Sequence, residues 1–180
     1  MITLNRLFST RERLKILSVI LYKKDDISIT DVSREARVSK GLVSNFFKIL
    51  LKEKILRRKG RKFRVGDAPK VKALKILFNL YKVDENLFKK YNFIRGAGIY
   101  GSFLRGENNE ESDIDMWILI DDKVSQEELA RFSKELKRKY GNVSPIYLTE
   151  NKLKKLKEKD KVFYYSLVFG SITIYGEKIE

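Results

Sequence analysis

The sequence predicts an α+β protein made of two small units. Residues 1–66 contain 18 basic and 6 acidic residues, whereas the whole chain of 180 residues contains 39 and 24, so the excess positive charge is local. The apolar spacing is helical over most of the first 90 residues and becomes strand-like from Phe93. We therefore expect a first domain at residues 1–67, connecting helices at 68–90 and a second domain at 91–180.

The composition limits the available chemistry. The chain contains no Cys and no His, which excludes disulfides, thiolate nucleophiles, imidazole bases and the usual zinc ligand sets. Carboxylates, hydroxyls, backbone amides, Lys and Arg remain. No apolar stretch reaches the roughly 18 residues of a membrane span, and the N-terminus lacks the pattern of a signal peptide. We expect a cytoplasmic protein without a membrane partner.

Three helices are predicted in the first domain. Ser9 and Glu12 have the spacing of a capping box, and the helix that they open is expected to run to about Tyr22. A short second helix is expected to begin at Thr30, after Ile29. Its buried positions are Val32 and Ala36, and the inward positions of the first helix are Leu14, Leu17, Ile20 and Leu21.

A tight turn at Arg37, Val38 and Ser39 separates the second helix from a third. Ser39 is expected to cap this third helix, which runs from Lys40 to about Lys54. The inward-facing residues are Val43, Phe47, Leu50 and Leu51. The outward-facing residues are Lys40, Gly41, Ser44, Asn45 and Lys48.

Two short β-prone runs around Gly60 then predict a basic hairpin at residues 55–65. The stretch 29–56 resembles the helix-turn-helix of winged-helix regulators, and the hairpin resembles their wing. The resemblance implies a double-stranded DNA partner, with the third helix in the major groove and the wing on the phosphate backbone. The expected groove contacts are Lys40, Ser44, Asn45 and Lys48. The expected backbone contacts are Arg57, Arg58, Lys59, Arg61, Lys62 and Arg64, which would make binding depend on salt.

Other uses of this domain stay open. A winged helix can serve only for protein contact or dimerisation, and an RNA-binding module is a third alternative. A homodimer is expected on the ground that winged-helix regulators commonly match two-fold DNA sites. Pro69 opens the connecting helix, whose apolar side either packs the two domains together or forms a dimer interface.

The second domain contains a linked pair of motifs, GSFLRG at 101–106 and SDID at 112–115. A strand from Phe93 to Tyr100 precedes the first motif, and the second opens a strand that ends at Ile120. This combination resembles the nucleotidyltransferase fold of the polymerase-beta superfamily in its smallest form, over most of residues 91–176. The resemblance implies a small mixed sheet and a site that binds a nucleoside triphosphate.

The spacing of these motifs suits metal-assisted chemistry on phosphate. Residues i and i+2 of a strand share a face, so Asp113 and Asp115 place two carboxylates side by side, where they suit Mg²⁺. We expect these two residues to be both the metal ligands and the catalytic residues. Gly101 lets the backbone approach the phosphate, and Ser102 lies at the start of a short helix. Arg105 either reaches phosphate or braces the loop through a nearby glutamate.

Family enzymes usually carry a third carboxylate on the next strand, which helps to bind metal or accepts a proton. After the helix Gln126–Tyr140, residues 142–148 contain no acid, and Ser144 or Ile146 occupies the expected position. Serine cannot act as an ionised base near neutral pH. Glu150 lies beyond the strand and is expected to be too far away.

The remaining sequence, a helix at 153–165 and a strand at 171–176, resembles the tail of small family members. Tyr164 and Tyr165 either belong to the core or stack on a base.

Two functions follow. In the first, the protein transfers a nucleotide to a hydroxyl group of an acceptor, and a partner protein is one such acceptor. In the second, it is a transcriptional regulator whose degenerate nucleotidyltransferase domain senses nucleotide or dimerises without catalysis. The sequence leaves turnover open.

Overall fold

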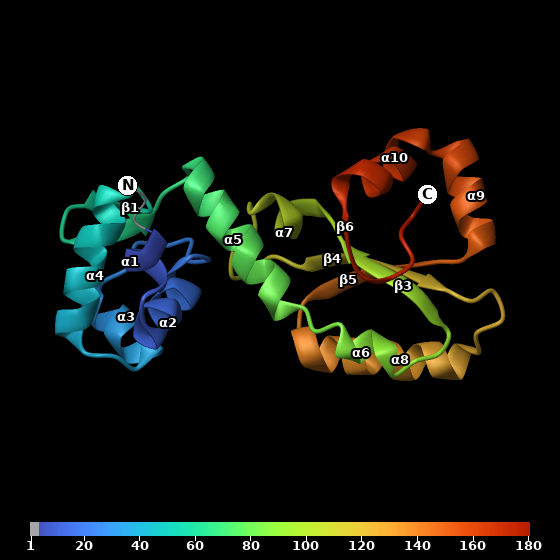
Figure 1. The fold of residues 1–180 in the computed structure, drawn as a ribbon, viewed down its shortest axis with the longest axis horizontal. Helices are drawn as coiled ribbons and strands as arrows, with labels where there is room; N and C mark the ends of the chain where they lie inside the picture. The colour runs from blue at the N-terminus through green and yellow to red at the C-terminus, as the bar shows by residue number, and fades with distance from the viewer. Residues whose placement is uncertain (1–3) are drawn as a thin grey trace. The chain divides into compact units, whose positions relative to one another are not determined.

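The computed structural model of the protein describes residues 4–180 (Figure 1). The chain divides into two units, Met1–Phe78 and Asn79–Glu180. The helix α5 (Pro69–Lys82) contributes residues to both. Within the described residues, no helix is long and apolar enough to cross a membrane.

The first unit consists of short helices followed by one hairpin. Its elements before α5 are α1 (Leu4–Phe8), α2 (Arg11–Ile20), α3 (Ile29–Ala36), α4 (Lys40–Lys52), β1 (Leu56–Lys59) and β2 (Lys62–Val65). The order of α2, α3, α4 and the hairpin agrees with the sequence prediction. The helix α1 was not expected, and its five residues bury only Leu7.

Two predicted helix starts are wrong by one residue. Thr10, not Ser9, caps α2: its backbone is extended and its side chain accepts a hydrogen bond from the Arg13 amide at 3.3 Å. Ser9 instead accepts a hydrogen bond from the Arg13 guanidinium. The helix α3 begins at Ile29 rather than Thr30, because Ser28 accepts a hydrogen bond from the Asp31 amide and therefore satisfies a donor at the first turn.

The turn between α3 and α4 has the predicted form. Arg37 ends α3 in the left-handed conformation with φ of 54°, and Ser39 caps α4 by accepting from the Leu42 amide. The Ser33 hydroxyl donates to the Val38 carbonyl at 2.6 Å, which fixes the chain inside the turn. These bonds hold the two helices at one relative orientation.

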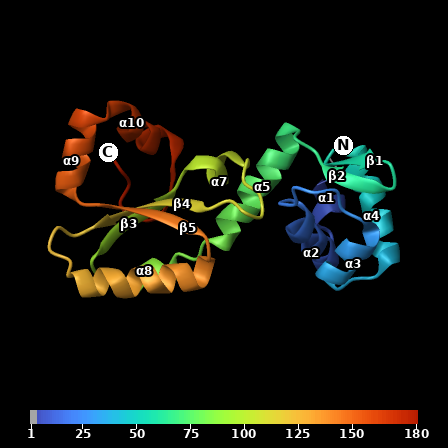
Figure 2. The same ribbon diagram turned by 180° about the vertical axis from the view of Figure 1, so that it is seen from behind.

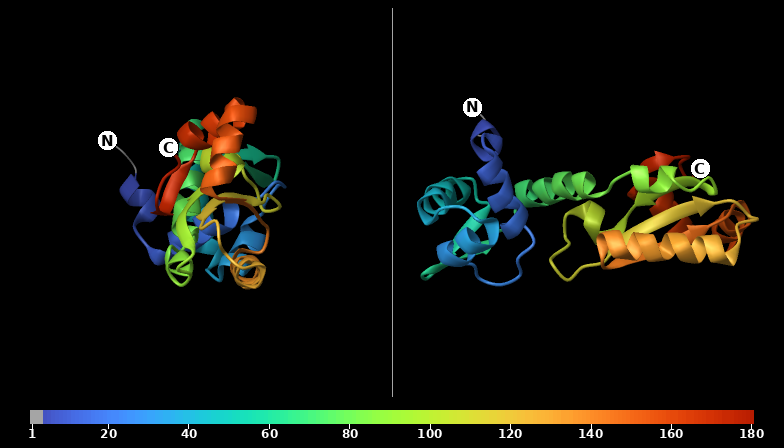
Figure 3. Two further views of the ribbon diagram at one scale, coloured as in Figure 1. Left: turned by 90° about the vertical axis from the view of Figure 1, so that its right-hand side faces the viewer. Right: turned by 90° about the horizontal axis from the view of Figure 1, so that it is seen from below.

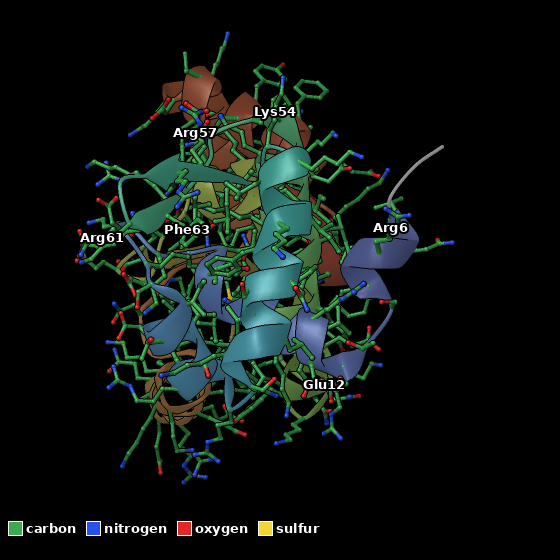
Figure 4. All side chains as sticks on the ribbon, turned by 90° about the vertical axis from the view of Figure 1, so that its left-hand side faces the viewer. Arg6, Glu12, Lys54, Arg57, Arg61 and Phe63 are labelled. Atoms are coloured by element: carbon green, nitrogen blue, oxygen red, sulfur yellow. The ribbon has the colours of Figure 1, made fainter. Side chains whose placement is uncertain are left out.

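The core of the first unit joins the helices to the hairpin. The inward positions Val43, Phe47 and Leu50 of α4 are fully buried, whereas Leu51 is only half-buried, contrary to expectation, because the helix ends beside it at Lys52. The Phe47 and Phe63 rings pack edge to face, 4.9 Å apart, and Phe63 lies between the hairpin and α4 in Figure 4. The Phe63 backbone also pairs with Ile27, so a third short extended segment borders the hairpin.

A four-stranded mixed sheet forms the centre of the second unit (Figure 2). Its strands lie in the order β5-β4-β3-β6, and only the β4–β5 pair is parallel. Their bounds are β3 (Ile94–Ile99), β4 (Ile114–Ile120), β5 (Val143–Leu148) and β6 (Ile172–Gly176). The helices are α6 (Asn86–Lys89), α7 (Gly101–Arg105), α8 (Gln126–Tyr140), α9 (Glu150–Lys159) and α10 (Lys161–Gly170).

Each face of this sheet is covered by its own helices (Figures 1 and 3). Even-numbered residues of β4, such as Met116 and Ile118, pack with α6 and α8 in one cluster that includes Phe132. Trp117 and Leu119 point the other way and pack with α9 and α10. Residues at i and i+2 of a strand share a face, so Asp115 lies on the α9 and α10 face.

The tail of the chain contains two helices where one was predicted over 153–165. Asp160 interrupts the run with φ of −136° and ψ of 72°, and its side chain caps α10 by accepting from the Phe163 amide. Aspartate competes with helical hydrogen bonding in this way at helix starts. Tyr164 is buried, and its hydroxyl donates to the Glu180 carbonyl.

The carboxylate of Glu135 on α8 makes the stability of the second unit sensitive to acid. The Tyr91 hydroxyl donates to it at 2.6 Å and Lys90 at 2.9 Å, and these bonds lower the pKa of Glu135. A lowered pKa contributes stability above the ordinary value near 4.5, and this contribution is lost as pH falls through the lowered pKa. We expect Glu135→Gln to lower the melting temperature at pH 7 and to leave it unchanged at pH 2.5. An equal decrease at both pH values would contradict this assignment.

Candidate functional site

A corner at the end of β3 begins the site. Tyr100 has an extended backbone and its amide donates to the Asp115 carbonyl at 3.1 Å, which ties the corner to β4. Gly101 then turns the chain into the five-residue helix α7 with φ of +68°. Gly106 ends α7 with φ of +65°. The motif glycines therefore stand where the backbone requires left-handed conformations.

The side chain of Asp115 reaches this corner. A methyl group built on Gly101 would lie 2.1 Å from the Oδ2 atom of Asp115, far inside van der Waals contact. Gly101 is therefore required for two reasons, its dihedral angles and the space that the carboxylate occupies. Ser102, the next residue of α7, is half-buried beside this contact.

Asp113 lies just before β4 and is held by a hydroxyl from the neighbouring strand. The Ser144 hydroxyl donates to Oδ2 of Asp113 at 2.8 Å. In the parallel β4–β5 pairing Ser144 is the register partner of Asp115, so one serine lies next to both acids. Ser144, rather than Ile146, is thus the strand β5 residue at the acidic pair.

The two carboxylates influence each other electrostatically. Burial is the largest cause that raises the pKa of Asp115, and the charge of Asp113 raises it further, while Arg105 opposes both. Burial, followed by the charge of Asp115, also raises the pKa of Tyr100. A negative potential thus surrounds the corner, and a cation placed there would relieve the repulsion between the acids.

Arg105 braces its own loop in this structure. Its Nε donates to Glu107 at 2.9 Å, one of the two arrangements expected from the sequence. Its side chain is 62% exposed, and its charge still acts on Asp115. A surface ion pair of this kind is weak, so an incoming phosphate would compete for the guanidinium at little cost.

A buried pair of asparagines, which the sequence analysis did not identify, positions the loop between the two motifs. The Asn79 amide donates to the Phe103 carbonyl at 2.6 Å and to the Asn108 side chain at 2.9 Å, and both asparagines are almost fully buried. Together they fix the end of α7 and the loop that leads to Asp113. The signal in the sequence is a single polar residue, Asn79, inside an apolar helical run.

No further acid completes the pair. Among residues 4–180, no group of three or more His, Cys, Asp or Glu side chains is arranged to hold a metal. Glu150 begins α9 and forms an ion pair with Arg95. Arg95 lies at the start of β3, whereas the acidic pair lies beside the end of β3. Glu150 is therefore at the opposite end of the strands from the acidic pair.

The basic residues of the first unit fall on two surfaces. On α4, Lys40, Asn45 and Lys48 are exposed, and Ser44 is half-buried. In the hairpin, Arg57 pairs across the strands with Arg64, and Lys59 pairs with Lys62. Alternation along a strand places these four cations on one face.

Acidic neighbours neutralise part of that face. Asp26 forms ion pairs with Lys59, at 3.2 Å, and with Arg64. Burial is the largest single influence and acts to raise the pKa of Asp26, but hydrogen bonds from the two cations together lower it. Asp67 pairs with Arg57.

Arg61 and Lys62, in contrast, have no ion pair among the residues that the structure describes. Arg61 lies at the hairpin tip (Figure 4). Arg58 donates to the Gly60 carbonyl. The net positive charge of the hairpin is therefore concentrated at its turn.

A mixed sheet whose paired acids meet a glycine-serine corner has the arrangement of a nucleotidyltransferase domain. The chain belongs to the Polymerase beta, Nucleotidyltransferase family, whose family model matches residues 84–180. A crystal structure of a proposed nucleotidyltransferase from Sulfolobus solfataricus is also similar, with 20% identity and a TM-score of 0.36; the match covers 59% of this chain and 84% of that one. No curated protein matches the sequence.

The contact between Gly101 and Asp115 predicts a specific cost of substitution. Gly101→Ala would strain a left-handed backbone position and displace the Asp115 carboxylate, so we expect a loss of about 2 kcal/mol in the free energy of unfolding. Gly141→Ala is the matched control, because Gly141 has a similar left-handed φ of +70° and its added methyl group would meet nothing within 4 Å. Denaturant unfolding of both variants measures the difference, and equal stability of the two would contradict the proposed packing.

Proposed function

We propose that the second unit binds a nucleoside triphosphate together with Mg²⁺ at the corner formed by Gly101, Ser102, Asp113 and Asp115, and transfers a nucleotide to a hydroxyl acceptor. The observation that carries this proposal is the contact of the Asp115 carboxylate with Gly101, since it brings the acidic pair to the glycine-serine corner. Membership in the nucleotidyltransferase family supports it. We include the hydroxyl side chain of a partner protein among the proposed acceptors.

The residues present fit a magnesium ion. Mg²⁺ is usually held by one or two carboxylates, with substrate phosphates and water completing its shell. Burial raises the pKa of Asp115 most, and the repulsion from Asp113, which raises it further, is the interaction that such a cation would relieve. When bound, the ion neutralises charge on the phosphates and on the attacking and leaving oxygens.

The chain's own groups would bind and orient the triphosphate. Gly101 has no side chain, so a phosphate could approach the backbone at this turn. Ser102 would supply a hydroxyl and a backbone amide at the start of α7. Arg105 would exchange Glu107 for phosphate. Ser144 would orient Asp113 by donating to its Oδ2 atom.

A second candidate function is a regulator that binds nucleotide without turnover. Ser144 favours it, because a hydroxyl stands beside the acids where related enzymes use a third carboxylate, and it cannot accept the proton of an attacking hydroxyl near neutral pH. In this alternative the nucleotidyltransferase domain senses nucleotide or dimerises.

The first unit, we further propose, is a winged helix-turn-helix that binds double-stranded DNA. The order α2, Ile27, α3, α4 and hairpin supports this, as does the bridge from Ile27 to Phe63, which adds the third short strand of such domains. The exposed Lys40, Asn45 and Lys48 of α4 would face the groove. The hairpin cations would contact phosphates, and a homodimer would match a two-fold site.

Variants of the acidic pair test whether nucleotide binding requires a metal ion. We expect Asp113→Asn and Asp115→Asn each to weaken Mg²⁺-dependent binding of a fluorescent ATP analogue at least tenfold, because each removes a charged metal ligand. Asp121→Asn, an exposed carboxylate just beyond the opposite end of β4, is the control. Binding that is equally tight with and without Mg²⁺ would reject the proposed metal site.

Label transfer separates the two candidate functions. The protein is incubated with labelled ATP, Mg²⁺ and candidate protein or small-molecule hydroxyl acceptors. If it is an enzyme, the acceptor should become covalently labelled, and Asp113→Ala should abolish this labelling. Ser144→Asp restores an acid at the third position and should increase transfer if chemistry is limited by its absence. Nucleotide binding with no transfer by either protein would favour the regulator.

The unpaired cations at the hairpin tip should dominate the salt dependence of DNA binding. We expect Arg61→Gln combined with Lys62→Gln to lower the slope of log K against log salt by about 1 to 2, because each cation engages a phosphate. Arg57→Gln should change it less, since Asp67 already pairs with Arg57. Fluorescence anisotropy with duplex DNA at several salt concentrations measures these slopes. An unchanged slope in the double variant would discredit the wing assignment.

A further inference from the structure

A second basic surface lies in the unit that carries the acidic pair. It consists of α9 and the start of α10, where every lysine side chain is exposed. These lysines are Lys152, Lys154, Lys155, Lys157, Lys159 and Lys161. Among the described residues none of the six forms an ion pair, although Lys152 donates to the Tyr147 carbonyl and Lys157 lies over the Tyr164 ring.

The acids within α9 and α10 offset this charge only in part. Glu150 is engaged by Arg95, and Asp160 caps α10. Glu158 is the third acid of these two helices. Leu153 and Leu156 pack on the sheet, so Lys154, Lys155 and Lys159 point away from it. Glu158 lies among these lysines, one turn after Lys154 and Lys155, but the surface keeps a net positive charge, which attracts a polyanion.

Exposed aromatic rings continue the same surface along α10. Phe169 is 80% exposed and Tyr165 is 46% exposed, and their rings are stacked, 5.8 Å apart with an interplanar angle of 10°. Val162, one turn earlier, is 84% exposed. Positions 162, 165 and 169 fall on one side of α10. Lys157 of α9 lies over the Tyr164 ring, which packs edge to face against Tyr165, so the end of α9 reaches these aromatic residues.

A solvated lysine-rich helix alone would not require the aromatic residues. Phenylalanine is normally buried, and its exposure beside a stacked tyrosine costs free energy unless a planar partner covers it. Lysines beside flat exposed rings are the combination that binds single-stranded nucleic acid, since cations follow the phosphates and rings stack on the bases. In a duplex the bases stack on one another, so a ring reaches their faces only by unstacking a base step.

We propose that the surface formed by α9 and α10 binds single-stranded nucleic acid, with bases stacked on Tyr165 and Phe169 and phosphates held by Lys154, Lys155 and Lys159. This proposal concerns a different surface from the hairpin and from the nucleotide corner. It does not depend on either, so duplex binding and label transfer can fail without affecting it.

The location relates this surface to the acidic pair. The helices α9 and α10 cover the face of the sheet to which Asp115 belongs, as Figure 1 shows for the fold of this unit. Ser171, at the end of α10, accepts a hydrogen bond from the Trp117 indole at 2.9 Å, and Trp117 is the residue that follows Asp115 on that face of β4. Tyr164 and Leu167 face the sheet from α10, so the helix lies between a strand bound on its exposed side and the sheet face that carries the acids.

The test uses the full chain with Arg61→Gln and Lys62→Gln in place, which weakens the hairpin as a competing site. Fluorescence anisotropy with a labelled 12-nucleotide single strand measures binding, in separate DNA and RNA arms that identify the preferred sugar. In this background, Tyr165→Ala with Phe169→Ala should weaken binding about tenfold or more, because stacking is lost. Lys154→Gln with Lys155→Gln should lower the salt slope by about 1.4.

Matched controls remove similar groups elsewhere. Tyr81→Ala deletes a ring that is 86% exposed on α5, and Lys134→Gln with Lys137→Gln removes two exposed lysines of α8, on the opposite sheet face. These controls should leave single-strand binding within twofold. Circular dichroism reports whether each variant is folded, as expected for exposed positions.

Three outcomes would overturn the proposal. The first is unchanged single-strand binding in both α9–α10 variants, and the second is an equal loss in the control variants. The third is loss of self-association in the aromatic variant, seen by sedimentation while single-strand binding persists, because it would assign the rings to a contact between copies of the chain.

Discussion

The candidate site depends on the contact between the Asp115 carboxylate and the bare backbone of Gly101. The Tyr100 amide donates to the Asp115 carbonyl at the end of the β3–β4 pairing, and the left-handed turn at Gly101 then begins α7. Any side chain at 101 would separate the acid from the corner. The buried Asn79 and Asn108 support the same geometry, because they fix the loop that carries the chain from α7 back to Asp113.

Much of this arrangement follows from local sequence signals. The α+β class and the helix α8 are predicted by periodicity, because such signals are contained in a few adjacent residues. Motif spacing places Asp115 on β4 as expected, whereas Asp113 lies one residue before that strand rather than on it. The family match at residues 84–180 supports the nucleotidyltransferase part of that prediction. The acid-free strand β5 was also evident, and the structure adds that its Ser144 donates to Asp113.

Features that rest on competing local caps or on tertiary contact were not predicted. The cap of α2 at Thr10 and the break at Asp160 depend on which of several neighbouring side-chain acceptors meets a free amide. The partnership of Asn79 with Asn108 joins positions 29 residues apart. Likewise, the acids that pair with the hairpin cations lie outside the hairpin, so composition alone suggested more available charge than the fold leaves.

The pairing of Asp26 with Lys59 and Arg64 has a consequence for how the hairpin discriminates among anions. A lone phosphate must displace a carboxylate that is already in place and gains little by the exchange. A ligand with regularly repeated negative charges can occupy the hairpin tip first and then compete for the remaining cations at high local concentration. If the hairpin binds anions as proposed, Asp26 would therefore favour long polyanions over small phosphorylated metabolites.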